Sequence, residues 1–406
     1  MYLPLFNELS IIIPPAILAE LFDVQLELIH FATEARKLRI IDPLIAILRH
    51  TEAFFAAQRH GQRISPEAFV WSVTPDLRRL ALCPNAHNII GPNLIATLEE
   101  QEPLLKQAIN MEHALSWVAY NLPLNKPITL EELRRMRYLT VTGDFEAANS
   151  ESPLTIEDPE IAALLSYRSD AALYLDLETV DATSVPFYLE QLCEFSSCAM
   201  YDAALQATIS MHAYHRIHPF NDPFDLTPVV LLHAIMARRN PYATGLMMPV
   251  SWYAAFKSRR FYEEVEEPLV TKGSNNNEFL TAFADRAHYT ALCFDASLRL
   301  SKAILHQAKA VDDEWREKIG RVSKGSAIDL LLIYLLAAPA ITVANAATAI
   351  GKSQSTTGAA LERLAQAGIV SRQPLNSKES VYVVDRACMV MIDFLSRINL
   401  DSLNID

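Results

Sequence analysis

This sequence contains few glycines, and it has no excess of positive charge. Only 10 of the 406 residues are glycine, whereas 51% are apolar, and long stretches rich in leucine and alanine favour a mainly α-helical fold. The net charge of −13 argues against a protein that coats nucleic acid over its whole surface, because neutralising phosphates requires clustered lysine and arginine. A small DNA-reading unit on an acidic body remains compatible with this charge. The length suits two or three domains.

Paired cysteines are also missing. The five cysteines lie in apolar segments and have no CxxC spacing, so we predict reduced core residues of a cytoplasmic protein, not disulfides or zinc ligands. The N-terminus has no basic start followed by a small-residue cleavage site, and no secretory signal is expected. The cysteines are Cys83, Cys193, Cys198, Cys293 and Cys388.

The longest uncharged stretch, residues 330–350, has the length needed to cross a bilayer. Pro339 and Asn345 interrupt it, and it is not flanked by aromatic and basic anchors in the usual arrangement. Two buried helices with a turn between them explain the stretch better. We therefore expect no association with a membrane.

Three blocks follow one another along the chain, without internal repeats. We predict a helical N-terminal region at 1–125, a helical core at 126–315 and a separate C-terminal unit at 324–398. In the core, Thr129 and Glu132 have the spacing of a capping box at the start of a helix. The core is further predicted to contain a strand-like run at 172–177, helices at 185–198, 199–216 and 228–239, and a loop at 218–227.

The C-terminal unit carries the clearest local pattern. Thr342 is placed to cap a short helix that ends at Gly351, and Ser353 to cap a second helix that ends at Gly368. The two helices have small and apolar faces that can pack together, and residues 328–336 supply a supporting helix. This is the tri-helical arrangement of a helix-turn-helix. Two β-rich runs around a polar turn at 376–378 then predict a hairpin wing.

This pattern resembles the winged helix-turn-helix of bacterial regulators over nearly its whole length, which implies double-stranded DNA as a partner. The basic excess between residues 352 and 386 is small, so a helical dimerisation or docking unit is the alternative reading. The start of the second helix offers donors and acceptors for base edges, and nearby basic side chains suit phosphates. The residues predicted to contact DNA are Lys352, Ser353, Gln354, Ser355, Thr356, Arg363, Arg372 and Lys378.

A second motif lies in residues 211–228. His218-Pro-Phe at the end of a helix, an Asp two residues further on and another apolar helix resemble the Fic domain. Tyr167 and Arg168, followed by the strand-like run, stand where Fic proteins have a short β flap, and residues 251–265 resemble the helix after the motif. The order of helical region, core and winged helix matches many bacterial Fic proteins. The resemblance implies a Fic-like helical core, and the family's usual reaction transfers AMP from ATP to a protein hydroxyl.

Only part of the Fic motif is matched. His218 corresponds to the general base and Asp222 to the acidic magnesium position. The family continues with Gly-Asn-Gly-Arg and ends with a second Arg. In those places this sequence has Pro223, Phe224, Asp225, Leu226 and Val229.

These replacements remove the groups that would hold phosphates. Glycine lets backbone N–H groups turn inward, whereas Pro223 has no N–H and fixes φ. Asp225 brings negative charge to the place of the phosphates, and Leu226 and Val229 lack the guanidinium donors. The sequence therefore predicts a catalytically degenerate site without a nucleotide cofactor.

The start of the helix that follows is also predicted to be satisfied from within the chain, with Thr227 as N-cap and Pro228 at the first helical position. Its dipole is then less available to an anion. In this interpretation His218 is a structural residue that caps the preceding helix.

Two weaker observations also favour a catalytically degenerate site. Residues 52–61 resemble the helix that restrains many Fic proteins, but His60 stands where the restraining Glu would be. His212, His215 and His218 have a spacing at which helical histidines can chelate, yet nothing beyond Asp222 completes a shell. We predict no metal site.

The leading hypothesis is therefore a DNA-binding transcriptional regulator on a catalytically degenerate Fic-like scaffold. A homodimer is expected because operators are commonly symmetric, and the core would serve as a dimerisation, sensing or protein-partner platform. The alternative is an enzyme of altered group-transfer chemistry, similar to AMP transfer, that uses His218 and Asp222. A third hypothesis is a protein-docking adaptor.

Overall fold

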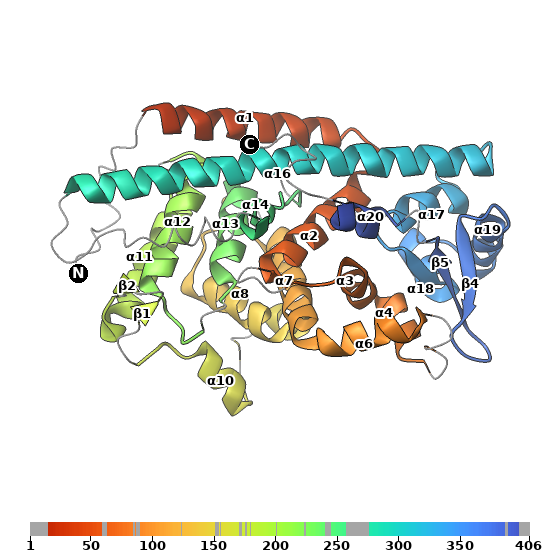
Figure 1. Cartoon of the computed structure of the whole chain (residues 1–406), viewed down its shortest axis with the longest axis horizontal. Coiled ribbons are helices and arrows are strands. Elements are labelled where there is room, and N and C mark those ends of the chain that lie inside the picture. The colour runs from red at the N-terminus through yellow and green to blue at the C-terminus, as the bar shows by residue number, and fades with distance from the viewer. Residues whose placement is uncertain are drawn as a thin grey trace.

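The computed structural model is mainly helical, as the composition predicted (Figure 1). None of the helices in the described part of the chain is long and apolar enough to cross a membrane, and the four cysteines that lie there are free thiols. The structure describes residues 15–58, 63–83, 86, 90–122, 124–150, 154, 156–169, 173–174, 177–178, 180–199, 201–222, 225–239, 245–256, 276–385 and 389–397.

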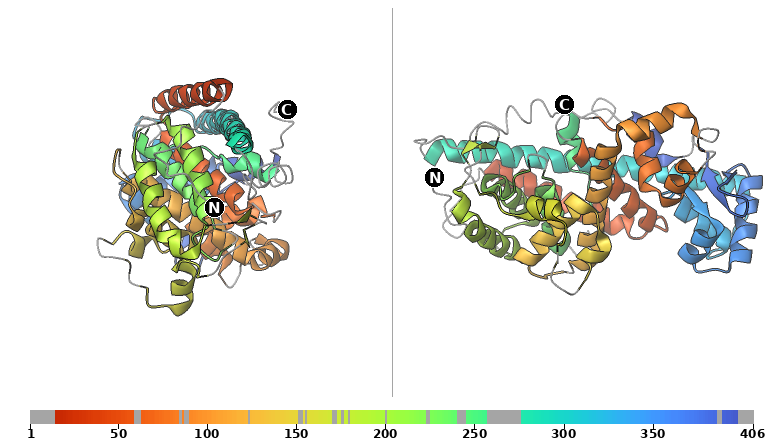
Figure 2. Two further views of the ribbon diagram at one scale, coloured as in Figure 1. Left: turned by 90° about the vertical axis from the view of Figure 1, so that its left-hand side faces the viewer. Right: turned by 90° about the horizontal axis from the view of Figure 1, so that it is seen from below.

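A single long helix, α16 (Asn276–Ile319), runs along the length of the molecule. Helix α1 (Pro15–Ala35) packs beside it, and the left-hand view in Figure 2 shows the two next to each other. The other helices of the body gather along one side of α16. The long helix thus connects the helical body with the C-terminal unit at one end of the molecule.

Helices α12 (Ala203–Ile217) and α13 (Thr227–Arg239) pack together in the middle of the body. Helices α2 and α7 belong to the predicted N-terminal region, yet α7 packs directly on α13. One hydrophobic core therefore extends across the predicted boundary near residue 125. The surrounding elements are α2 (Ile41–Ala57), α3 (Pro66–Val73), α4 (Pro75–Ala81), α6 (Pro92–Glu100), α7 (Glu102–Asn121), α8 (Leu130–Thr142), α9 (Phe145–Ala148), α10 (Pro159–Leu165), η1 (Ala182–Ser184), α11 (Val185–Ser197) and α14 (Ser251–Phe256).

Helix α8 begins and ends where local chemistry dictates. Thr129 accepts a hydrogen bond from the Glu132 N–H at 3.3 Å, and the Glu132 carboxylate accepts one from the Thr129 N–H at 3.1 Å, which confirms the predicted capping box. The helix ends at Gly143, whose φ is 69°. A Cβ on Gly143 would lie 2.3 Å from the Asn110 side-chain oxygen, so glycine is required there for space as well as for φ.

The predicted strand-like run forms a short antiparallel flap of two strands, β1 (Leu173–Tyr174) and β2 (Leu177–Glu178). Leu173 pairs with Glu178 and Tyr174 with Leu177. The antiparallel pairing lets the backbone groups of the two strands satisfy each other. The flap lies on the side of the body near α11 (Figure 1).

The C-terminal unit contains the predicted supporting helix, two capped helices and hairpin, together with a strand, β3, and a helix, α20, that the sequence did not predict. Its three strands form one antiparallel sheet in the order β3-β5-β4. Thr342 accepts from the Asn345 N–H at 3.2 Å, Ser353 accepts from the Thr356 N–H at 3.2 Å, and Gly351 has a φ of 63°. The predicted caps are therefore confirmed. The elements are α17 (Ala327–Leu335), β3 (Ala340–Thr342), α18 (Val343–Ile350), α19 (Gln354–Gln366), β4 (Val370–Pro374) and β5 (Ser380–Val384), followed by α20 (Val390–Arg397).

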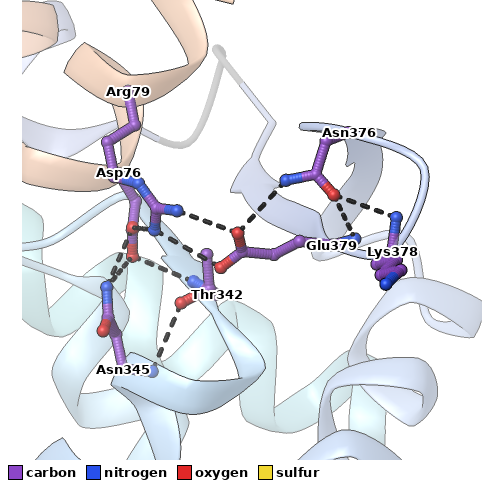
Figure 3. Close-up of polar contacts among 7 residues, drawn as sticks. All are labelled: Asp76, Arg79, Thr342, Asn345, Asn376, Lys378 and Glu379. Atoms are coloured by element: carbon purple, nitrogen blue, oxygen red, sulfur yellow. Dashed lines mark hydrogen bonds and ion pairs between the residues drawn. The ribbon is translucent and has the colours of Figure 1, made fainter.

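A polar network attaches this unit to α4 of the body (Figure 3). Asp76, only 3% exposed, accepts hydrogen bonds from the Thr342 N–H at 2.9 Å and from the Asn345 amide at 2.9 and 3.0 Å. Arg79 pairs with Glu379 next to the wing turn at 2.8 Å. Asp76 thereby binds the start of α18, and Arg79 binds the wing next to its turn.

A second attachment comes from α16. Arg316 pairs with Asp312 on its own helix at 2.8 Å and with Asp329 on α17 at 2.7 Å. Arg363 near the end of α19 donates to the carbonyl of Ile319 at 3.3 Å. The C-terminal unit is therefore held from two sides.

Replacing Asp76 should loosen this attachment. In Asp76→Ala the buried Thr342 N–H and the partly exposed Asn345 amide lose their acceptor, which should lower the free energy of unfolding by about 3 kcal/mol. Urea unfolding measures the loss, and hydrogen exchange should increase first in residues 342–350. The matched control is Asp313→Ala, whose side chain is 62% exposed and should change stability by under about 0.5 kcal/mol. An unchanged exchange rate in α18 would contradict the assigned role of Asp76.

Candidate functional site

The loop between α12 and α13 begins with a strained residue. His218 is the C-cap of α12, with φ 41° and ψ 67°, and its N–H donates to the Tyr214 carbonyl at 2.9 Å. Residues other than glycine are uncommon in this left-handed region, although histidine is among those found there more often, so contacts with the neighbouring structure help to hold His218 in it. The predicted helix-capping role of His218 is confirmed.

Arg168 and Tyr167 supply that neighbouring structure. The Arg168 N–H donates to the Pro219 carbonyl at 2.9 Å, and Tyr167 forms an antiparallel bridge with Phe220. The Arg168 side chain, buried at 3% exposure, donates from Nε to the His218 carbonyl at 2.8 Å and from Nη2 to the carbonyls of Val180 and Ile217. The segment before the flap is therefore fastened to the backbone of the motif.

Arg137 of α8 is the largest charged group buried under the loop. Its side chain is 1% exposed, and Nη1 lies 2.9 Å from Oδ2 of Asp222 and 3.1 Å from Oδ1 of Asp225. Nη2 donates to the Leu164 carbonyl at 3.1 Å, and the guanidinium carbon lies 4.9 Å from the centre of the Phe220 ring. Burial acts to lower the pKa of Arg137, but the nearby carboxylates and Tyr214 raise it overall. Both terminal nitrogens of the guanidinium are thus bonded to groups of the chain itself, whereas the buried Nε has no hydrogen-bond partner among the described residues.

Asp225 occupies the start of α13. Its Oδ1 accepts from the N–H of Thr227 at 2.9 Å and from the Thr227 hydroxyl, and its Oδ2 accepts from the Tyr214 hydroxyl at 2.6 Å. Burial, together with this carboxylate, raises the pKa of Tyr214 well above its usual value. The prediction of Thr227 as N-cap was wrong: Thr227 is the first helical residue, and the carboxylate two residues earlier accepts its N–H.

His218 shares this electrostatic environment. Burial lowers the pKa of the imidazole, and Arg168 and Arg137 act in the same direction, whereas Asp225 and Asp222 oppose them. His218 is therefore mainly neutral at pH 7. Leu226 and Val229, each 3% exposed, pack into the core beside it. Pro223 and Phe224, on which part of the sequence argument depended, lie outside the described residues.

Arg137 and Tyr214 were missed by the sequence analysis. A signal for Arg137 was present, because Leu133, Met136, Arg137 and Thr140 follow the i, i+3, i+4, i+7 spacing of the buried face of α8. A lone arginine on an apolar face needs a buried anion. Tyr214 lies among buried residues of α12, and nothing in its spacing distinguishes it from an ordinary core tyrosine.

Helix α2 contributes another buried acid. Glu52 is 0% exposed and accepts from His233 Nε2 at 2.9 Å and from both the N–H and the hydroxyl of Ser251 at 2.9 Å. Its carboxylate joins α2, α13 and α14. Helix α2 ends at Ala57, and His60, which the resemblance aligned with the restraining Glu, lies outside the described residues. Within those residues no group of three or more His, Cys, Asp or Glu side chains gathers as a metal site.

The residues predicted to contact DNA fall into two groups. Lys352 to Thr356 form one exposed segment at the turn before α19 and its first residues. The three others are spread out: Arg363 is near the far end of α19, Arg372 lies on β4, and Lys378 is exposed in the wing turn. Arg372 lies 3.3 Å from Glu362 in an exposed pair, and Arg363 contacts the end of α16. The residues predicted to contact base edges thus lie next to one another, whereas Arg363, Arg372 and Lys378, predicted to bind phosphates, lie apart.

Comparison with solved structures finds the crystal structure of a Fic family protein from Desulfovibrio desulfuricans G20. The similarity covers 95% of this chain and 99% of that chain, with 14% identical residues and a TM-score of 0.45. No protein-family model matches the sequence. No curated protein matches it.

Proposed function

We propose that this chain is a DNA-binding transcriptional regulator whose winged helix reads double-stranded DNA. In this proposal the helical body carries a degenerate Fic-like site and acts as a platform for dimerisation or a protein partner, without nucleotide transfer. The observation that carries the proposal is the exposed polar start of α19. Gln354, Ser355 and Thr356 lie there next to one another, all exposed.

The packing of α19 supports this assignment. The helix contacts α17, α18 and β4 on one side, where Thr357, Leu361 and Leu364 are buried. Its other side is exposed, and it lies at the end of the molecule away from α8 and α11 (Figures 1 and 2). A helix presented in this way can enter a major groove, with its first residues at the base edges.

Basic side chains near this surface fit phosphate contacts. Lys352 precedes α19, and Lys378 is exposed in the wing turn. Arg372 is paired with Glu362, but both side chains are about half exposed, at 60% and 47%. Such a pair contributes little to stability, so a phosphate can displace it at low cost. The body remains acidic, which confines DNA to this end of the molecule.

The geometry under the motif argues against nucleotide transfer. A phosphate at the start of α13 would meet the carboxylate of Asp225, and the Thr227 N–H is already donated to that carboxylate. Arg137 cannot serve a phosphate without giving up its ion pairs with the nearly buried Asp225 and the partly buried Asp222. In phosphate-binding sites of other proteins, helix amides and guanidinium groups donate to the phosphate. Here the carboxylate of Asp225 accepts from both kinds of donor.

Selection from random duplex DNA tests the proposal directly. The full-length chain is incubated with a pool of duplexes, and bound DNA is recovered and sequenced over successive rounds at about 0.15 M salt, where non-specific contacts are weak. The proposal expects one enriched sequence, in two symmetric half-sites if the chain is a dimer. A pool that stays random after repeated rounds would exclude sequence-specific DNA binding.

A further inference from the structure

The wing turn has a well-defined structure of its own. The Asn376 side chain accepts hydrogen bonds from the N–H groups of Lys378 and Glu379, each at 2.9 Å. The Leu375 N–H donates to the Glu379 carbonyl at 2.9 Å. These bonds close the turn on itself. The backbone of Lys378 is therefore held in place, and its side chain remains exposed.

An acid directly follows the basic residue of this turn. Glu379 is the only acidic residue between Val370 and Val384, and its side chain is 33% exposed. Consecutive Cα atoms lie about 3.8 Å apart, well inside the distance of about 8 Å over which charges act at physiological salt. A carboxylate without a partner at this position would attract the Lys378 ammonium and repel an approaching phosphate.

Arg79 of helix α4 is the partner of this carboxylate (Figure 3). Its Nη2 lies 2.8 Å from Oε2 of Glu379, and its Nη1 lies 3.4 Å from Oε1. The hydrogen bond to Glu379 is the largest reason why the pKa of Arg79 is raised. One guanidinium thus engages both carboxylate oxygens, a geometry that arginine provides and lysine does not.

The position of the guanidinium does not depend on Glu379 alone. Nη1 of Arg79 also lies 3.2 Å from Oδ1 of Asp76, and the buried Asp76 is fixed by the Thr342 N–H at the start of α18. An isolated exposed ion pair contributes little, whereas a bidentate pair within a network of charges contributes more. Because α4 packs on β3 and β5 as well, Arg79 is held where it cancels the charge of Glu379.

We propose that Arg79, a residue of the helical body, prepares the wing for DNA by neutralising Glu379 and so leaving Lys378 available to a phosphate. This inference rests on the proposed DNA function. In it Arg79 is a positioning residue, which acts through the wing turn and does not itself contact DNA. The turn carries a net positive charge only while α4 supplies its guanidinium. The body thus takes part in DNA binding instead of serving only as a support for the winged helix.

A double-variant cycle tests the inference with the full-length chain and a duplex of arbitrary sequence, since phosphate contacts are independent of sequence. Arg79→Ala should weaken binding about fivefold, because the Glu379 carboxylate then competes for Lys378. Glu379→Gln should change binding less than about twofold in the unmodified chain, but should restore binding in the Arg79→Ala variant. If Arg79 only attached the wing to the body, Glu379→Gln would bring no such recovery. The same effect of Glu379→Gln in both backgrounds overturns the inference, as does tighter binding by Arg79→Ala.

Arg78→Ala is the matched control, because Arg78 is an exposed arginine next to Arg79 on α4. It removes the same charge and should change binding less than about twofold. A loss as large as that in Arg79→Ala would show that the total charge of α4 matters, not its contact with the wing, and would overturn the inference.

Hydrogen exchange without DNA gives a readout of the contact itself. The amides of residues 375–380 should exchange faster in Arg79→Ala and at an unchanged rate in Arg78→Ala. Unchanged exchange in both variants overturns the assigned contact. Failure of the unmodified chain to bind any duplex overturns the proposed function together with this inference. Duplex binding without coupling between Arg79→Ala and Glu379→Gln overturns this inference alone.

Discussion

Arg137→Met should lower the free energy of unfolding by about 3–5 kcal/mol, because it leaves the nearly buried carboxylate of Asp225 and the partly buried carboxylate of Asp222, which is 23% exposed, without their cation. The Arg137 side chain is 1% exposed, and Asp225 is 9% exposed. Methionine keeps the length of the side chain, so the loss reports charge and hydrogen bonds more than volume. Urea unfolding of the full-length variant measures the change.

A double variant separates the ion pair from general damage to the core. Combining Arg137→Met with Asp225→Asn removes one uncompensated charge and should recover about 1 kcal/mol or more relative to Arg137→Met. Arg134→Ala on the same helix makes none of these contacts and serves as the control, with an expected change under about 0.5 kcal/mol. A loss below about 1 kcal/mol in Arg137→Met would show that the buried pairs do not hold the loop together.

The second large effect is expected at the start of α19. Gln354→Ala should weaken binding to the selected duplex by about 10- to 100-fold, the range in which loss of one base-edge contact pair falls. Binding to unrelated duplexes should stay unchanged, because phosphate contacts carry no sequence information. Fluorescence anisotropy with both duplexes gives the two affinities.

Gln366→Ala is the matched control for this measurement. Gln366 is an exposed glutamine at the other end of α19, and its loss should change the affinity less than twofold. Lys378→Ala should behave differently from both, because a phosphate contact weakens all duplexes alike and reduces the salt dependence by about one charge. A Gln354→Ala variant with unchanged discrimination would show that another surface reads the DNA.

Much of the C-terminal unit could be predicted from the sequence because its determinants are local. Thr342, Ser353 and Gly351 act within a few residues of their own position, and the caps they form confine both helices. The same holds for Thr129 and Glu132 at the start of α8. Local capping depends on backbone geometry that a short sequence window specifies.

The candidate site under the motif could be predicted only in part. The helix-capping role of His218 followed from its place at the end of an apolar helix, and the prediction that Asp225 would oppose a phosphate remains a prediction. Arg137, the partner of Asp225, lies 88 residues earlier, and the bond between Asp76 and Thr342 spans 266 residues. Contacts of this range depend on how helices pack, which periodicity does not specify. The predicted domain boundaries and the DNA-contacting residues remain predictions.

The proposed loss of nucleotide binding depends above all on the start of α13 being occupied from within the chain. Calorimetric titration of the full-length protein with ATP and Mg²⁺ tests this most directly, because a phosphate would have to displace Asp225 from the Thr227 N–H and from Arg137. We predict no saturable heat at ATP concentrations up to about 1 mM, a limit that corresponds to about 4 kcal/mol of binding free energy. A one-to-one isotherm with a micromolar Kd, weakened by Asp222→Asn, would contradict the account.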